Sequence, residues 1–420
     1  MSQPLISNTQ ARRAEPRIKR FVQPLRRWAH VWFGLRLLLS FWVAIWSMML
    51  PLLPQERAVH GWPPSLPIGA WLERVFLLPW LRWDVSYYLN IATRGYRLDD
   101  GTAQFHPLYP WLGQAAGLLL GGNMLLGLLV VSSGCTLACY VWFERLALLD
   151  LPPSIARRAT LYFALAPISF ILFAPYTESL FLLCSILALF HARQRHWWLA
   201  GAAGGFAALT RQQGIFLLVP LAWEVWEASE RQWSGLRRSW RAVLALMLVP
   251  FGLLLWLIYR GFVLGDVAFD PAKPQTLIYS LLISRSSAQV VPLQAFVPPW
   301  TALRAAFNSL SMPGSYTTLI ELVLGGLFAL VFALGWRWLW RLRPSYLLYS
   351  FVMLLVSFSY YTGPFFPYMG LQRHCLLAFP IFLPLAVWGR RIPIHWLVVI
   401  VGLLGMLFLS MLYSIEAWVP

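Results

Sequence analysis

Charged side chains are scarce in this sequence. Asp, Glu, Lys and Arg make up 12% of its 420 residues, whereas soluble domains carry roughly 25%. Hydrophobic residues make up 59%, so the composition excludes an ordinary soluble domain and indicates a chain embedded in a membrane.

Cysteine is also scarce. The four cysteines all lie in or beside apolar segments, which excludes a disulfide framework of the kind found in small secreted domains. Cys135 and Cys139 stand four residues apart on one helical face, but no histidine or third cysteine joins them at zinc-ligand spacing. We therefore interpret both as packing residues.

Long apolar runs recur from Trp32 to the C-terminus. The first run lacks a small-residue cleavage site and is longer than a signal-peptide core, so it indicates an anchor. We predict an all-α polytopic bundle with a basic tail over 1–31 and one transmembrane domain over 32–420, in which 54–123 and 263–315 are long outer connections. The spans are predicted, approximately, at 32–53, 124–146, 160–175, 179–192, 197–210, 214–226, 242–262, 316–336, 345–361, 374–388 and 395–413.

The basic residues are unevenly distributed over the predicted connections. With the N-terminus inside, 22 of the 33 Lys and Arg residues, Arg36 among them, fall on the inner face, but only six of the 16 acids do. This distribution follows the positive-inside rule. The net charge of +17 therefore indicates orientation and contact with anionic membrane lipid, and not binding of nucleic acid.

The first long connection contains the segment Trp83–Pro110, WDVSYYLNIATRGYRLDDGTAQFHPLYP. Part of it has the spacing of a short helix that ends at a glycine, through Asp84, Tyr88, Ile91 and Gly95. His106-Pro107 then opens an apolar stretch over 108–120 that is too short to span, and it predicts a helix in the outer membrane interface.

Several blocks in this order, between Trp83 and Phe382, carry a resemblance: WDVSYYLNIATRGY with FHPLYPWL, APYTESLFLL, ALTRQQG and LQRHCLLAFPIF. They resemble the PIG-V family of mannosyltransferases, which in eukaryotes adds the second mannose to the glycosylphosphatidylinositol precursor. That family belongs to the GT-C superfamily. The resemblance implies a GT-C bundle, a polyprenyl-phosphate sugar donor and a catalytic acid in the first outer loop. The connection at 263–315 matches no family block, so the identity of the acceptor does not carry over.

The residues also point to this chemistry by themselves. An outward-facing transferase needs a lipid-anchored donor, a base for the acceptor hydroxyl and a cation for the departing phosphate. Only Asp84 is embedded among aromatics that could stack on a sugar, namely Trp83, Tyr87 and Tyr88, so we predict that it is the general base. Capping of the following helix is its alternative role. The candidate outer acids are Glu56, Glu73, Asp84, Asp99, Asp100, Glu178, Asp266, Asp270, Glu321 and Glu416.

Polar residues at the outer ends of spans are candidates for substrate binding. Glu178 is predicted to contact a ligand or acceptor, with a helix-start acid as the alternative. Arg211, followed by Gln212, is predicted either to pair with Glu178 or to hold a phosphate.

Two further candidates follow the sequence YYTGPFFPYMG. Arg373 is predicted to bind phosphate, with snorkelling to the interface as the alternative, and His374 stands beside it. In the first loop, His106 is predicted to touch the sugar or orient the acid, and a simple turn is its alternative.

The expected reaction moves a hexose, with mannose the first choice, from a polyprenyl-phosphate donor to a lipid or glycan acceptor, with inversion. No cofactor is expected, although Asp84 and Glu178 could share a cation. Only two of the 33 basic residues are lysines, which favours a prokaryotic plasma membrane over the endoplasmic reticulum. Two other classes stay open: a transporter or flippase for a lipid-linked saccharide, and a non-catalytic assembly subunit.

Overall fold

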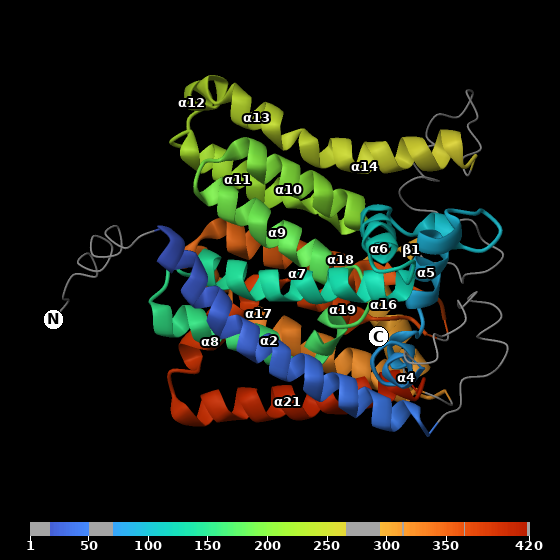
Figure 1. Cartoon of the computed structure of the whole chain (residues 1–420). Helices are drawn as coiled ribbons and strands as arrows, with labels where there is room; N and C mark the ends of the chain where they lie inside the picture. The colour runs from blue at the N-terminus through green and yellow to red at the C-terminus, as the bar shows by residue number, and fades with distance from the viewer. Residues whose placement is uncertain (1–16, 50–69, 266–294, 313–314, 365, 418–420) are drawn as a thin grey trace.

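The structure is a computed structural model, and it describes residues 17–49, 70–265, 295–312, 315–364 and 366–417 (Figure 1). Three of the candidate acids, Glu56, Asp266 and Asp270, lie outside these ranges.

The described residues are almost entirely helical, as predicted. Helices run side by side across the view of Figure 1, and one antiparallel ladder of two residues joins β1 (Ala295–Phe296) to β2 (Tyr360–Tyr361). The α-helices are α2 (Arg17–Ser47), α4 (Ala70–Phe76), α5 (Val85–Arg94), α6 (Leu108–Leu119), α7 (Met124–Ala147), α8 (Pro153–Leu165), α9 (Glu178–Arg193), α10 (Trp197–Thr210), α11 (Leu218–Ala228), α12 (Trp233–Arg238), α13 (Trp240–Leu246), α14 (Leu248–Ile258), α16 (Pro299–Ser309), α17 (Tyr316–Leu342), α18 (Pro344–Ser359), α19 (Leu371–Leu376), α20 (Phe382–Trp388) and α21 (Ile392–Ser414).

Five helical segments within the described residues are long and apolar enough to cross a membrane. They are 23–47 in α2, α7, 240–263, α17 and α21. A bilayer core of about 30 Å needs roughly 20 helical residues, which these segments provide. The chain is therefore an integral membrane protein.

The other predicted spans are helical but shorter or interrupted. The segment predicted at 160–175 is α8 followed by a 3-10 turn, η4 (Pro167–Leu172), because Pro167 cannot continue the α-helical hydrogen bonding. The segment predicted at 374–388 is divided in the same way between α19, the 3-10 turn η7 (Phe379–Ile381) and α20. Such interruptions expose backbone and side-chain polar groups inside the bundle, where they can form a site.

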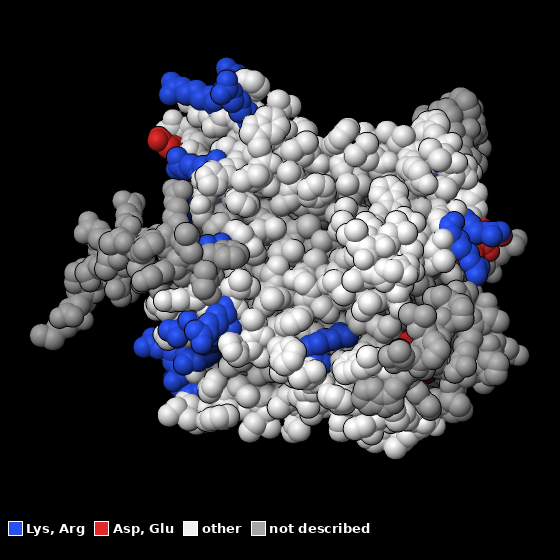
Figure 2. All heavy atoms as spheres, in the orientation of Figure 1, with Lys and Arg blue, Asp and Glu red and all other residues white. Residues whose placement is uncertain are grey.

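One end of the bundle, which we call the basic end, collects most of the arginines. Short connections between α7 and α8, α9 and α10, α17 and α18, and α20 and α21 all lie there. Figure 2 shows Lys and Arg gathered at this left-hand end, next to a broad and mostly uncharged band, while a smaller mixed patch marks the opposite end. This separation along the helices is the pattern that the positive-inside count predicts.

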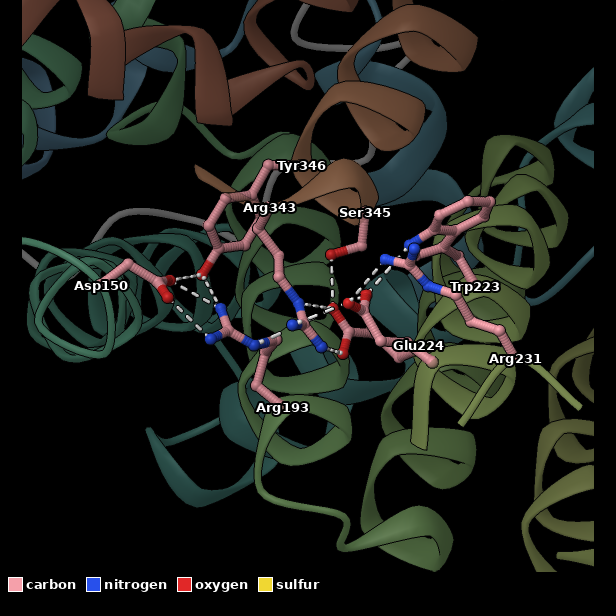
Figure 3. Close-up of polar contacts among 9 residues, drawn as sticks. Asp150, Arg193, Trp223, Glu224, Arg231, Arg343, Ser345 and Tyr346 are labelled. Atoms are coloured by element: carbon pink, nitrogen blue, oxygen red, sulfur yellow. Dashed lines mark hydrogen bonds and ion pairs between the residues drawn. The ribbon is translucent and has the colours of Figure 1, made fainter. Parts of the chain in front are cut away.

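Ion pairs fasten the helices at the basic end (Figure 3). Arg193, at the end of α9, binds both oxygens of Asp150 at 2.6 and 2.7 Å, and the Tyr346 hydroxyl donates to the same carboxylate at 2.9 Å. Glu224 of α11 accepts from Arg343 Nε at 2.9 Å and from the Ser345 hydroxyl at 2.5 Å. These side chains come from the connection after α7, from α9, from α11 and from the start of α18, so they fix the register of these helices.

The structure corrects several sequence expectations. The first helix begins at Arg17, inside the predicted tail of 1–31, so basic residues form its first turns. Arg36 lies well inside that helix and not on a connection, where its guanidinium donates to the Phe173 carbonyl at 2.7 Å. The predicted interfacial helix exists as α6, but it packs closely on α7, because Gly113 and Gly127 let the two backbones approach. Its depth in the membrane stays a prediction.

Candidate functional site

Four charged side chains form a chain of contacts at the end opposite the arginine-rich connections, which we call the site end. Arg373 Nη1 lies 2.7 Å from Asp84 Oδ2, and Arg373 Nε lies 3.6 Å from Glu178 Oε1. Arg211 Nη1 approaches the same Glu178 oxygen at 2.5 Å. Two acids and two arginines from segments up to 289 residues apart thus meet in one cluster, which the predicted pairing of Arg211 with Glu178 anticipated in part.

Burial differs among the four side chains. Glu178 is fully buried, and the side chains of Arg211 and Arg373 are 11% and 12% exposed, whereas Asp84 is 24% exposed. The most accessible member is therefore the acid predicted to act as the base. Both guanidinium Nε atoms are buried and have no hydrogen-bond partner among the described residues, and that of Arg373 faces Glu178 at 3.6 Å.

Asp84 occupies the position before the first residue of α5, but its side chain makes no capping hydrogen bond. The capping role is therefore not what its carboxylate does in this structure, since that carboxylate points to Arg373. The helix ends at Arg94 and is followed by Gly95 as its C-cap, with φ 83°, as the spacing predicted.

The backbone that carries Asp84 is held by the C-terminal end of α21. The Arg82 guanidinium donates from Nε to the Ser414 carbonyl at 3.3 Å and pairs with Glu416 at 3.0 Å. The Tyr413 hydroxyl donates to the Trp80 carbonyl at 2.9 Å. Sequence reasoning missed these anchors, because they join positions more than 330 residues apart and no local pattern reveals them.

Glu178 is the first residue of α9. It follows the 3-10 turn η4 and the short segment 173–177. Thr177 supplies a hydroxyl that accepts from Arg211 Nη1 at 2.8 Å. Arg373 lies over the ring of Tyr176, with 5.3 Å between its Cζ and the ring centroid. Tyr176 and Thr177 were not predicted as site residues, although both belong to the block APYTESLFLL that signalled the region.

Two of the predicted aromatic partners of Asp84, Tyr88 and Trp83, are packed against other parts of the protein. Tyr88 is 3% exposed and packs edge-on against Phe105, Tyr109 and Tyr176. Trp83 has φ 53° and a buried indole N–H without a hydrogen-bond partner among the described residues. Contact of either ring with a sugar stays a prediction, and for Tyr88 it would need movement of the surrounding rings.

The two histidines are buried. His106 Nδ1 lies 2.8 Å from the Ala208 carbonyl, so it fastens the first loop to α10 close to Arg211. His374 packs edge-on against Tyr360, with 5.4 Å between the ring centroids. Gln212 begins the 3-10 turn η5 (Gln212–Leu217) after Arg211 and is half-buried. Direct roles of these side chains in binding stay predictions.

Three more of the candidate acids make contacts outside the cluster. Asp99 is exposed and pairs with Arg97, and Asp100 accepts from the Thr102 backbone N–H. Glu321 accepts from backbone donors at the start of α19.

A cation shared by Asp84 and Glu178, as predicted, would have to compete with an arginine for the two carboxylates. Arg373 contacts both acids, so its own positive charge lies between them. Within the described ranges, no group of three or more His, Cys, Asp or Glu side chains is placed to hold a metal ion.

A family model described as mannosyltransferase (PIG-V) matches residues 34–265. The chain belongs to the PIG-V mannosyltransferase family. The match includes three members of the cluster, Asp84, Glu178 and Arg211, together with His106, and ends before Arg373.

Known proteins provide further comparisons. GPI mannosyltransferase 2 of Schizosaccharomyces pombe is 24% identical over 146 residues, which is 34% of this chain and 31% of that protein. The chain thus matches only about a third of this curated relative. ArnT from Cupriavidus metallidurans bound to undecaprenyl phosphate is similar in structure, with a TM-score of 0.49 and 14% identity, over 93% of this chain and 74% of that one. The oligosaccharyltransferase AglB from Archaeoglobus fulgidus is also similar in structure. Its TM-score is 0.41 and its identity is 13%, over 92% of this chain and 56% of that one.

Proposed function

We propose that this chain is a GT-C mannosyltransferase that transfers mannose from a polyprenyl-phosphate donor to an acceptor at the outer face of the membrane. Membership of the PIG-V family supports the sugar. The observation that carries the proposal is the contact of Arg373 with Asp84 and Glu178 in one partly open cluster at the site end. It brings a candidate base within 2.7 Å of a candidate phosphate ligand.

The cluster offers two guanidinium groups to the phosphate of a lipid-linked donor. Two guanidinium groups face two carboxylates, and each guanidinium keeps a buried Nε without a hydrogen-bond partner among the described residues. A phosphate oxygen that binds Arg373 would compete with the Asp84 carboxylate for the same donors. Donor binding would then release Asp84 from its ion pair and leave it next to the reacting sugar.

The reaction follows from these positions. Asp84 accepts the proton of the acceptor hydroxyl while the hydroxyl oxygen forms a bond to the anomeric carbon. The bond between that carbon and the phosphate oxygen breaks, and its electron pair leaves with polyprenyl phosphate. Arg373 and Arg211 stabilise the charge that develops on this leaving group. A single displacement of this kind inverts the configuration at the anomeric carbon.

We also propose the orientation. The basic end would face the cytoplasm, by the positive-inside rule, and the site end would face outward. A plasma membrane is our choice, because lysine is almost absent among the basic residues. A sugar carried by a lipid suits this geometry, since nucleotide sugars are confined to the other side.

Equilibrium binding of polyprenyl phosphate to the purified protein in lipid nanodiscs tests the phosphate site. Arg373→Ala should weaken binding by about 1.5–3 kcal/mol, the usual contribution of a hydrogen bond to a charged group. Arg373→Lys keeps the charge and loses the forked geometry, so it should fall between the alanine variant and wild type. Unchanged affinity in Arg373→Ala would refute the role of Arg373 and make Arg211 the better candidate.

A further inference from the structure

Glu321 is a buried carboxylate that the proposed reaction does not use. It lies in the first turns of α17 and is 1% exposed. Its two oxygens accept from consecutive backbone N–H groups, Oε1 from Gly370 at 3.0 Å and Oε2 from Leu371 at 2.6 Å. An acid buried this deeply needs such partners, because an unpaired carboxylate in a membrane interior is costly.

The two N–H groups belong to the start of α19, the short helix that carries Arg373. Gly370 has φ 80° and ψ 29°, a left-handed conformation that favours glycine. Residues 370 and 371 turn their N–H groups to one side, and such consecutive donors form a concavity for an anion. Glu321 fills it from within the protein, and two otherwise unpaired helix-start donors are satisfied.

A second feature of α17 supports the same contact. Gly325 lies one helical turn after Glu321, and a Cβ atom at Gly325 would lie 2.6 Å from Leu371 Cδ2. On α17, Glu321 therefore binds the backbone of Leu371, and the missing side chain of Gly325 leaves space for the Leu371 side chain. A long helix of 27 residues provides a rigid support for a helix of six.

We infer that Glu321 is a positioning residue for Arg373: it fixes the start of α19, so that the guanidinium two residues later reaches both Asp84 and Glu178. The inference rests on the proposed phosphate role of Arg373. Because Glu321 acts through the backbone of 370–371, its loss should matter only while Arg373 is present.

A double-mutant cycle tests this coupling, with polyprenyl phosphate binding in nanodiscs as the measurement. Glu321→Gln keeps the size but offers a single acceptor oxygen, and its amide group would face the other backbone donor. We expect it to weaken binding by roughly 10-fold or more, up to the loss expected for Arg373→Ala, because a displaced guanidinium loses its charged hydrogen bonds. In the Arg373→Ala background, the same substitution should have almost no further effect.

Two more variants keep the test interpretable. Glu321→Asp retains the charge and shortens the side chain by one methylene, so a milder loss of affinity is expected from a protein that still folds. Glu224→Gln changes a buried acid at the basic end, where Arg343 and Ser345 hold it. That control should lower thermal stability and leave polyprenyl phosphate affinity as in wild type.

The outcomes distinguish a failure of the positioning role of Glu321 from a failure of the phosphate role of Arg373. Equal losses from Glu321→Gln in the wild-type and Arg373→Ala backgrounds would overturn the positioning role, because the effect would then not pass through Arg373. If Arg373→Ala itself binds polyprenyl phosphate normally, the proposed function fails first.

Discussion

Replacement of Asp84 by Asn addresses the proposed chemistry directly. The substitution keeps the size and polarity of the side chain and removes its ability to accept a proton at neutral pH. In the structure the carboxylate makes no capping hydrogen bond to α5, and it lies 2.7 Å from Arg373. The variant therefore loses a base and one ion pair, while the start of the helix keeps its backbone contacts.

The two losses differ in size. General-base catalysis contributes roughly 10²–10⁴-fold, which corresponds to about 2.7–5.4 kcal/mol in the activation free energy. A hydrogen bond to a charged group contributes about 1.5–3 kcal/mol to stability, and this is an upper bound here. The Asn carbonyl can still accept from Arg373, and Glu178 remains near the guanidinium. Turnover should therefore fall far more than stability.

The assay measures mannose transfer and thermal unfolding on the same preparation. Asp150→Asn is the matched control, since Asp150 is also paired with an arginine, at 2.6 Å, but lies at the basic end. We expect the control to lose stability and keep its turnover per folded molecule. Asp84→Asn should show the reverse and still bind polyprenyl phosphate, because Arg373 and Arg211 are unchanged.

Near-wild-type turnover in Asp84→Asn would refute the role of Asp84 as base. A loss of stability as large as that of Asp150→Asn, together with lost activity, would show that the ion pair supports the fold and would leave the base unassigned.

Two further predictions concern orientation and stereochemistry. A reporter fused after Asp99 should report an external location and one fused after Arg238 a cytoplasmic one, and the opposite pair of signals would invert the bundle and remove the reason for a lipid-linked donor. The configuration of the transferred mannose, measured by NMR of the product, should be opposite to that of the donor, and retention would exclude a single displacement.

The sequence predicted the broad architecture because hydrophobic runs and arginine distribution are local or additive properties. Every predicted span is helical at least in part, and the arginine-rich connections collect at one end. The predicted helix boundaries were wrong at prolines and at helix starts. Pro167 divides a predicted span, and the first helix extends back to Arg17, because helical propensity continued where hydrophobicity had ended.

The site was predictable only as separate residues. Asp84, Glu178, Arg211 and Arg373 each stand out as polar positions beside apolar runs, but their meeting depends on tertiary packing across 289 residues. Glu321 was visible only as one of ten acids predicted to lie on the outer side. Its function in holding α19 depends on backbone donors, which no side-chain pattern reveals.

The most direct test of the account is a transfer assay with the purified protein and two labelled donors, polyprenyl-phosphate mannose and GDP-mannose, against a screen of lipid acceptors. The account predicts a mannosylated product from the lipid-linked donor alone, and its loss in Asp84→Asn. Transfer from GDP-mannose without any lipid-linked intermediate would contradict it.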